Sequence, residues 1–398
     1  EHAIRQVDET SLTQRDLRGG GSGRRCPSHA GMLSMNARDP ERATQTKEEA
    51  IAVYVSSSSS HISPREYLNS LVKASSTDTN QVSNIVFVKT HKTCSSTLAS
   101  MLEAYGQRHR LKRAYYHPRN DHVHPLKQAA PEILKECGGR VDVMAYHVAK
   151  FDQFALSWDQ NERLYRDIMR DPENINYVTI FRDPREQLVS FYYYFIEHKT
   201  TQSIGEFLAS AAAADPELNI IRNPLARELG VRDAADAKYF VQTVLPTYKL
   251  VMLHESFDRG LLVLRRLMRW HMIDIVHVPR NKSKPTVSSW RTKHGVQTYA
   301  RPHYADLPLK ARKTIDELTV LDRILYEGGK VIWEKTLNSM AGHIEADQAA
   351  YHGLMGTTRQ FLKNNRTSLA HELYDPSRKA LDSNMMHKPF DPDETFPF

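Results

Sequence analysis

The chain has 398 residues, of which 40% are hydrophobic and 25% charged, and its formal net charge at pH 7 is +7. This composition excludes a wholly disordered protein and leaves room for one large domain or two smaller ones. The positive balance favours an anionic ligand, but no zinc-finger spacing, basic heptad region or aromatic RNA-binding motif points to nucleic acid. No run of 18 apolar residues predicts a transmembrane helix.

The domain organisation follows from where low-complexity sequence stops. Residues 1–81 contain a glycine-rich stretch and five consecutive serines, Ser56–Ser60, and are predicted to be a stem or linker. Residues 82–340 alternate strand and helix patterns and are expected to form one domain. Residues 341–398 mix polar helix signals with proline and are expected to be a peripheral tail.

The first ordered unit is predicted to be a strand, a polar loop and a helix. Ile85–Val88 is a short apolar run typical of a strand buried on both faces, and Leu98, Met101, Leu102 and Tyr105 recur at helical spacing. The loop between them presents backbone N–H groups, hydroxyls and two lysines at a helix N-terminus, which is a suitable anion site. Two plainer readings stay open at this point: a simple Ser/Thr helix cap, or a nucleotide P-loop from which the glycines are missing.

Further strands and helices follow in chain order. Val141–Tyr146 is a predicted strand that ends at His147, and Tyr177–Phe181 is another, followed by Arg182-Asp183-Pro184 as a helix start. Other elements are expected, as helices, at 161–169, 184–198, 204–214, 257–270 and 307–333, and, as strands, at 250–253 and 275–278. This alternation predicts an α/β fold, a P-loop-like domain with a central parallel sheet flanked by helices. Ligands of such sheets bind at the carboxyl ends of the strands, so the loop after Val88 and the segment after Phe181 are expected to meet.

Histidine and cysteine are the remaining reactive residue types. His117, His122 and His124 lie within eight residues, but no carboxylate or cysteine falls at ligand spacing, so no metal site is predicted. Cys94 could be read as a nucleophile, although a small residue packed in a tight turn is the more common case. An odd number of cysteines leaves at least one thiol unpaired.

Two segments together resemble the sulfotransferases that use 3′-phosphoadenosine-5′-phosphosulfate (PAPS). Lys-Thr-His-Lys-Thr-Cys-Ser-Ser-Thr-Leu at 89–98 is similar to the loop of the galactose 3-O-sulfotransferase branch, and Arg182 is followed by Ser190 at the spacing of that superfamily. Arg119-Asn120-Asp121, Asn223-Pro224 and the helix around 321–326 are also similar in order and spacing. The resemblance spans about residues 82–340, and it departs at Cys94, where a small residue such as Ala is usual.

The resemblance implies transfer of a sulfuryl group from PAPS to a hydroxyl of a carbohydrate, with 3′,5′-bisphosphoadenosine (PAP) as product and no metal. His91 is the expected base, with His147 as a second candidate, and Lys92 is expected to stabilise the leaving phosphate. The expected donor-binding residues are Lys89, Thr90, Lys92, Thr93, Cys94, Ser95, Ser96, Thr97, Arg182, Ser190, Arg280 and Lys282. The alternative for the basic loop that carries Arg280 and Lys282 is a solvated surface.

The acceptor is expected to be galactose in a glycolipid or glycan, contacted by Arg119, Asn120, Asp121, His124 and His147. The resemblance also implies a location in the Golgi lumen, with a membrane anchor upstream of residue 1. Two other functions stay open on the residues alone: a nucleotide-binding phosphotransferase, and a non-catalytic glycan-binding protein of the same fold.

Overall fold

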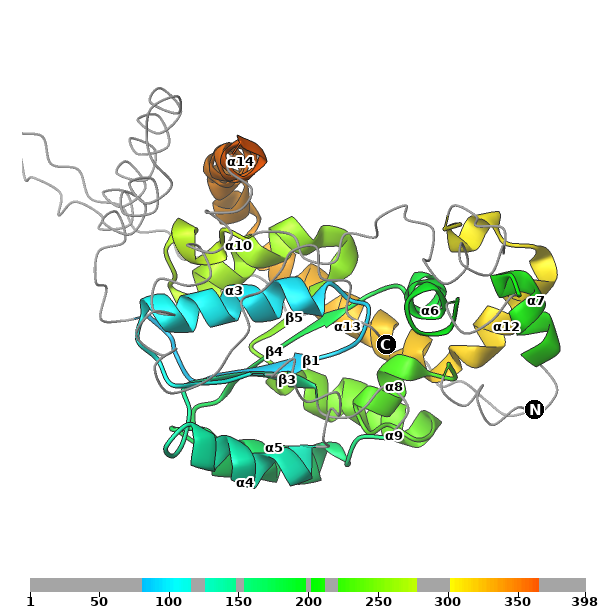
Figure 1. Cartoon of the computed structure of the whole chain (residues 1–398), viewed down its shortest axis with the longest axis horizontal. Coiled ribbons are helices and arrows are strands. Elements are labelled where there is room, and N and C mark those ends of the chain that lie inside the picture. The colour runs from blue at the N-terminus through cyan, green and yellow to red at the C-terminus, as the bar shows by residue number, and fades with distance from the viewer. Residues whose placement is uncertain are drawn as a thin grey trace, which may run out of the picture. The chain divides into compact units, whose positions relative to one another are not determined.

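The strands form one parallel sheet in the order β2-β3-β1-β4-β5 (Figure 1). The computed structural model describes residues 81–115, 126–147, 154–197, 202–211, 221–277 and 301–364. The chain divides into two units, Glu1–Ala43 and Thr44–Phe398, and every described residue falls in the second. The strands are β1 (Ile85–Lys89), β2 (Arg113–Tyr115), β3 (Val143–His147), β4 (Asn176–Phe181) and β5 (Leu250–Leu253).

Helices cover both faces of the sheet, as the predicted α/β class requires. One face carries α3 (Ser95–Arg108) and α10 (Phe257–Met268), and the other carries α4 (Leu126–Glu136), α5 (Trp158–Ile168) and α9 (Ala234–Tyr239) (Figure 1). The strands have no polar face because both sides are covered: all five residues of β1 are buried, Lys89 among them. The other helices are α6 (Pro184–Phe191), α7 (Ile204–Ala211), α8 (Pro224–Glu228), α12 (Leu309–Leu318), α13 (Val320–Ser339) and α14 (Ala341–Asn364).

The order of the strands places the site. The chain runs from β1 outward to β2 and β3 on one side, then returns to the other side of β1 with β4 and β5. The connections therefore diverge between β1 and β4, and the loops at the carboxyl ends of these two strands leave a position open for a ligand. The polar loop after β1 and the Arg182 segment after β4 both lie there, as predicted.

The structure differs from the sequence prediction at the strand expected over residues 275–278. Residues 275–278 are predicted to form a strand, but Met272–Ile275 forms a 3₁₀ turn and Val276 and His277 belong to no strand. Val278 lies outside the described residues. The reason is Asp274, which is fully buried, accepts the His271 N–H at 3.2 Å, and pairs with Arg108 and His109 at 3.1 Å each. A buried carboxylate with these partners stabilises a tight turn better than an extended strand.

The segment expected to be a peripheral tail also differs in its first part. Helix α14 contributes Ile344, Tyr351, Leu354 and Met355 to the main core. Its Asp347, almost fully buried, accepts from Arg265 and Arg266 of α10 at 2.6–2.8 Å. Residues 341–364 are therefore packed onto the domain, while the linker assignment of residues 1–81 stays a prediction. Among the described residues, no helix is both long and apolar enough to cross a membrane.

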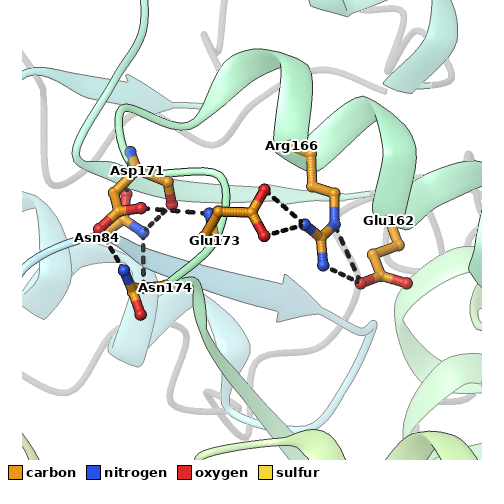
Figure 2. A network of polar contacts seen from close by, with 6 residues as sticks. All are labelled: Asn84, Glu162, Arg166, Asp171, Glu173 and Asn174. Atoms are coloured by element: carbon orange, nitrogen blue, oxygen red, sulfur yellow. Dashed lines mark hydrogen bonds and ion pairs between the residues drawn. The ribbon is translucent and has the colours of Figure 1, made fainter.

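A polar network fixes the opposite edge of the sheet, where β1 and β4 begin (Figure 2). Asn84 Nδ2 donates to the carbonyls of Asp171 and Asn174 at 2.6 and 2.7 Å, and Asn84 Oδ1 accepts the Asp171 N–H at 3.2 Å. Asn84 has φ 64°, a left-handed conformation that asparagine tolerates better than most residues. Arg166 extends the network to Glu173 and Glu162 (Figure 2).

Replacing Asn84 with Ala is expected to lower the free energy of unfolding by about 2 kcal/mol. The reason is that the Asp171 and Asn174 carbonyls and the Asp171 N–H each lose a part-buried hydrogen bond, and alanine is strained at this φ. Urea unfolding followed by circular dichroism measures the change. Glu173→Ala in the same network is the control. The Glu173 side chain is 76% exposed, so its removal should lower the free energy of unfolding by less than about 1 kcal/mol. Equal losses in the two variants would contradict this account.

Candidate active site

The loop after β1 has the geometry of an anion site. Lys92 and Cys94 both have positive φ, 63° and 64°, which curls the chain so that consecutive N–H groups turn toward one side. Cys94 is the N-cap of α3 but makes no side-chain cap, and the first turn contains no acidic residue. The Thr97 N–H donates to the Cys94 carbonyl at 3.0 Å, and the amides of Ser95 and Ser96 at the start of α3 remain for a ligand that carries negative charge.

The threonines of the loop serve its internal structure. Thr90 Oγ1 donates to the Ile180 carbonyl at 3.0 Å, Thr93 Oγ1 donates to the Thr90 carbonyl at 3.1 Å, and the two hydroxyls contact each other at 3.0 Å. Both side chains are fully buried, so the main chain is what these two residues can present to an anion. Ser95 and Thr97 are buried as well, Ser96 is half-buried and Cys94 is exposed.

Two contacts join the loop to the segment after β4. Arg182 Nη1 donates to the Lys92 carbonyl at 3.1 Å, and Gln187 Nε2 donates to the His91 carbonyl at 2.8 Å. Asp183 caps α6 by accepting from the N–H groups of Arg185 and Glu186. Ser190 lies further along α6 and is buried. The sequence prediction that the two segments meet is thus confirmed, whereas a phosphate contact by Ser190 stays a prediction.

Positive charge is concentrated at this edge. Burial together with the charges of Arg301 and Arg182 lowers the pKa of Lys92 to about 7. Burial also lowers the pKa of Arg182 and of Arg301, and the charge of Arg182 contributes to the effect on Arg301. Cations that destabilise one another in this way gain most from an anion bound between them. Arg301 was not among the predicted residues, because it lies more than a hundred residues from Arg182 in the sequence.

The ammonium group of Lys92 packs against an aromatic ring. Its Nζ lies 3.6 Å from the centroid of the Tyr194 ring, and Tyr194 is 44% exposed. Tyr194 belongs to a π-helical turn, Tyr192–Ile196, directly after α6. Such turns are frequent at functional sites, and the cation–π contact keeps the ammonium group at the loop.

His91 has a carboxylate partner that the sequence did not reveal. Its backbone N–H donates to Glu228 Oε2 at 2.7 Å, and its Nδ1 pairs with Glu228 Oε1. Glu228 is buried on the short helix α8, and this contact fixes the neutral imidazole as the tautomer with a proton on Nδ1. Burial and the charges of Lys89 and Lys92 lower the pKa of His91, so its Nε2 can act as an acceptor at neutral pH.

His147 completes this arrangement from the neighbouring strand. It is paired in register with Lys89, and its ring stacks on His91 with centroids 3.9 Å apart and planes 14° apart. Burial and the charges of His91 and Lys89 lower the pKa of His147, which favours a second neutral imidazole. The sequence prediction that His147 lies beside the His91 loop is borne out in position, and its role stays a prediction.

His91, His147 and Glu228 could also be considered as metal ligands, since their ligand atoms lie within 4.8 Å of one another. A metal ion binds an imidazole nitrogen in the plane of the ring. Two rings stacked 3.9 Å apart cannot both direct that plane at one ion without turning. The cluster as it stands therefore favours a hydrogen-bonded base over a metal centre.

Several predicted residues lie outside the described part of the chain. These are the proposed acceptor contacts Arg119, Asn120, Asp121 and His124, and the donor-loop residues Arg280 and Lys282. The most important residue that the sequence analysis missed is Glu228. One signal was present: the charged pair Arg227-Glu228 lies among the apolar residues of Pro224–Leu229, where a buried charge needs a partner.

Comparison with known proteins identifies the family. The profile of one family, described as Galactose-3-O-sulfotransferase, matches residues 42–303. The chain belongs to this family.

Individual relatives agree with that assignment. Human galactosylceramide sulfotransferase is 30% identical over 217 residues, which are 50% of this chain and 48% of the relative. Galactose-3-O-sulfotransferase 2 of Sus scrofa is 30% identical over 241 residues, 55% of this chain and 57% of the relative. Human galactose-3-O-sulfotransferase 3 is 29% identical over 216 residues, which are 50% of this chain and 47% of the relative. The chain spans about half the length of the curated relatives it matches.

Proposed function

We propose that this member of the galactose-3-O-sulfotransferase family transfers the sulfuryl group of PAPS to the 3-hydroxyl of galactose in a glycolipid or glycan. The observation that carries the proposal is the pairing of His91 with Glu228 directly beside Lys92 and the amide-rich start of α3. This arrangement joins a neutral base to an anion site, and sulfuryl transfer needs both.

The donor is assigned to the loop and to the cations around it. The 5′-phosphosulfate lies against Lys92 and the loop amides that lead into α3, while Arg182 and Ser190 hold the 3′-phosphate. Positive charge supports this placement, because Arg182 and Arg301 both act on Lys92 electrostatically. A guanidinium group binds phosphate through a planar pair of donors, which would select PAPS over donors without a 3′-phosphate.

The transfer is a displacement at sulfur between two oxygens in line. His91 Nε2 takes the proton of the galactose hydroxyl, and that oxygen forms a bond to sulfur. The bond between sulfur and the bridging oxygen breaks, and PAP leaves with the negative charge. Glu228 stabilises the imidazolium that forms, and Lys92 stabilises the charge on the leaving phosphate. No step in this scheme uses a metal.

The acceptor class comes from the relatives, whose names specify galactosylceramide and galactose. Arg119, Asn120, Asp121, His124 and His147 are proposed to hold sugar hydroxyls, and Arg280 and Lys282 to contact the donor. A location in the Golgi lumen is proposed on the family resemblance.

A phosphotransferase is the less favoured alternative. It needs a carboxylate to hold Mg²⁺ near the phosphates. β4 ends in Phe181 and is followed by Arg182, and the next carboxylate, Asp183, is occupied in capping α6. At the end of β4 the chain therefore offers a cation where a kinase would offer a metal ligand.

Thermal unfolding in the presence of nucleotides tests the donor assignment. PAP is expected to raise the unfolding temperature, whereas ATP with Mg²⁺ should leave it unchanged at the same concentration. Transfer of label from [³⁵S]PAPS to a set of galactosides tests the reaction. Stabilisation by ATP alone, or labelling of no galactoside, would contradict the proposal.

PAP binding is also expected to take up protons near neutral pH. The pKa of Lys92 is about 7 without ligand, and a bound phosphate favours the charged amine and raises it. Lys92 is therefore partly neutral at pH 7.5 in the free protein and charged in the complex, so affinity for PAP falls as pH rises above about 7. Calorimetry in buffers of different ionisation enthalpy measures the uptake. Lys92→Met should abolish it, and an uptake unchanged in that variant would contradict the assignment.

A further inference from the structure

Helix α8 has only five residues, yet it carries the carboxylate that holds His91. A helix of this length is not stable by itself, so contacts from elsewhere must fix its position. Its carboxyl end is set by the Arg227 carbonyl, which accepts the Ala155 N–H at 2.9 Å, and by Gly230, where φ is +74°. The question is then what holds its amino end.

The amino end of α8 is held by α13 and by the last residue of α12 through reciprocal hydrogen bonds. Asp322 accepts the Leu225 N–H at 3.2 Å and the Ala226 N–H at 2.7 Å, one with each carboxylate oxygen. In return, Asn223 Oδ1 accepts the Leu321 N–H at 2.9 Å, and the Asn223 N–H donates to the Leu318 carbonyl at 2.8 Å. These bonds join the segments around Asn223-Pro224 and 321–326, which resemble the family in sequence but had no role assigned to them.

Asp322 replaces the cap that α8 itself lacks. The N-cap residue Asn223 has φ 46° and makes no side-chain bond to the helix. Asp322 is fully buried, and burial raises its pKa to about 7, while the two amide bonds and the charge of Arg227 act in the opposite direction. The amino end of α8 thus stabilises the carboxylate form, in the way that helix N-termini favour negative charge.

We propose that Asp322 is a positioning residue for the base: it fixes α8, α8 fixes Glu228, and Glu228 sets the orientation and tautomer of His91. This inference rests on the proposed function, because it assigns the base of that reaction. Asp322 touches neither substrate nor donor, so its effect must pass through Glu228. A role in stability alone would show no such dependence.

A double-mutant cycle on kcat separates the two roles. Asp322→Asn keeps the shape of the side chain but turns an NH₂ group toward an amide N–H, and should lower kcat about ten-fold in the wild-type background. In the Glu228→Gln background the same change should alter kcat less than about two-fold, because the link to His91 is already broken. The affinity for PAP should stay unchanged in Asp322→Asn, since the loop after β1 is intact. Losses that multiply across the cycle would overturn the proposal.

Asp347→Asn is the matched control for lost stability. Asp347 is also a buried aspartate that accepts several hydrogen bonds, but its partners are Arg265 and Arg266 beneath α14. It should lower the unfolding temperature and leave kcat at a permissive temperature within about two-fold of wild type. If Asp322→Asn does not fold, Asn223→Gly replaces it, because glycine accepts the positive φ and removes only the bond to Leu321.

A readout independent of activity is the tautomer of His91. The imidazole ¹⁵N shifts of the wild-type protein should show the proton on Nδ1, and Asp322→Asn should raise the population protonated on Nε2. If the wild type transfers no sulfuryl group, the proposed function fails, and this spectrum still decides the inference. An unchanged tautomer in Asp322→Asn would overturn it.

Discussion

Replacing His91 with Ala is expected to lower kcat by about 10²- to 10⁴-fold, the range that a lost general base typically costs. The acceptor hydroxyl would then have no group to take its proton as the bond to sulfur forms. PAP affinity should change little, since the amides and cations of the donor site remain. Single-turnover transfer from labelled PAPS, with PAP titration in parallel, measures both quantities.

His109→Ala is the control for this variant. His109 follows α3, and its Nε2 contacts Asp274 at 3.1 Å, away from the carboxyl ends of the strands. Its replacement should reduce stability but leave kcat within about two-fold. The kcat of Glu228→Gln should lie between those of His91→Ala and His109→Ala, about 10- to 10³-fold below the wild type. In this variant His91 keeps its ring but loses the carboxylate that sets its tautomer. A His91→Ala enzyme that turns over at full rate would remove the base assignment.

The acid limb of the pH profile gives a second test of His91. Burial and two nearby lysines lower its pKa, so the base form persists below the usual titration range of histidine. The protonated form is inactive as a base, and activity therefore falls only when pH drops below that lowered pKa. A limb centred at pH 6.5 or above in kcat would contradict this environment for His91.

Replacing Lys92 with Met is expected to lower kcat by about 10²- to 10³-fold, comparable to the loss of one oxyanion donor elsewhere. Lys92 is assigned to the charge that develops on the leaving phosphate, so its loss should reduce kcat more than it raises KM for PAPS. The position of its Nζ over the Tyr194 ring places that charge at the loop. Stopped-time assays over a range of PAPS concentrations separate the two parameters.

Lys112→Met changes the same charge at the other edge of the sheet. Lys112 precedes β2, and its Nζ donates to the Gly138 carbonyl at 2.8 Å in an exposed position. The kcat of Lys112→Met should equal that of the wild type. This result would show that the change in net charge alone does not cause the loss of kcat in Lys92→Met. Equal losses for Lys92→Met and Lys112→Met would contradict a local role for Lys92.

The parts of the site that depend on patterns among residues close together in the sequence could be predicted. The loop 89–98 and the Arg182 segment each follow an apolar strand directly, and parallel strands bring their carboxyl ends to one edge. Glu228 could not be placed in this way, because its contact with His91 joins residues 137 apart in the chain. The same limit applies to Asp322, whose partners on α8 are 96 and 97 residues away.

The differences between the predicted and the observed elements have local physical causes. β2 contains only Arg-Ala-Tyr, which is too short for an alternating pattern to be recognised. The apolar run at 275–278 predicts a strand, because nothing in the sequence indicates that the preceding Asp274 pairs with Arg108 in the interior. Helix α14 looked polar because much of its surface is exposed, and only its contacts with α10 show that one side belongs to the core.

The position of the new sulfate is the most direct test of the central claim. The enzyme is incubated with PAPS and a galactose-terminated glycoside, and the product is examined by proton NMR. A downfield shift of the galactose H3 signal is expected, and it should appear at least about 10²-fold more slowly in His91→Ala and at nearly the wild-type rate in His109→Ala. A product sulfated at another hydroxyl would contradict the galactose 3-hydroxyl as acceptor, and transfer at the wild-type rate in His91→Ala would contradict the site.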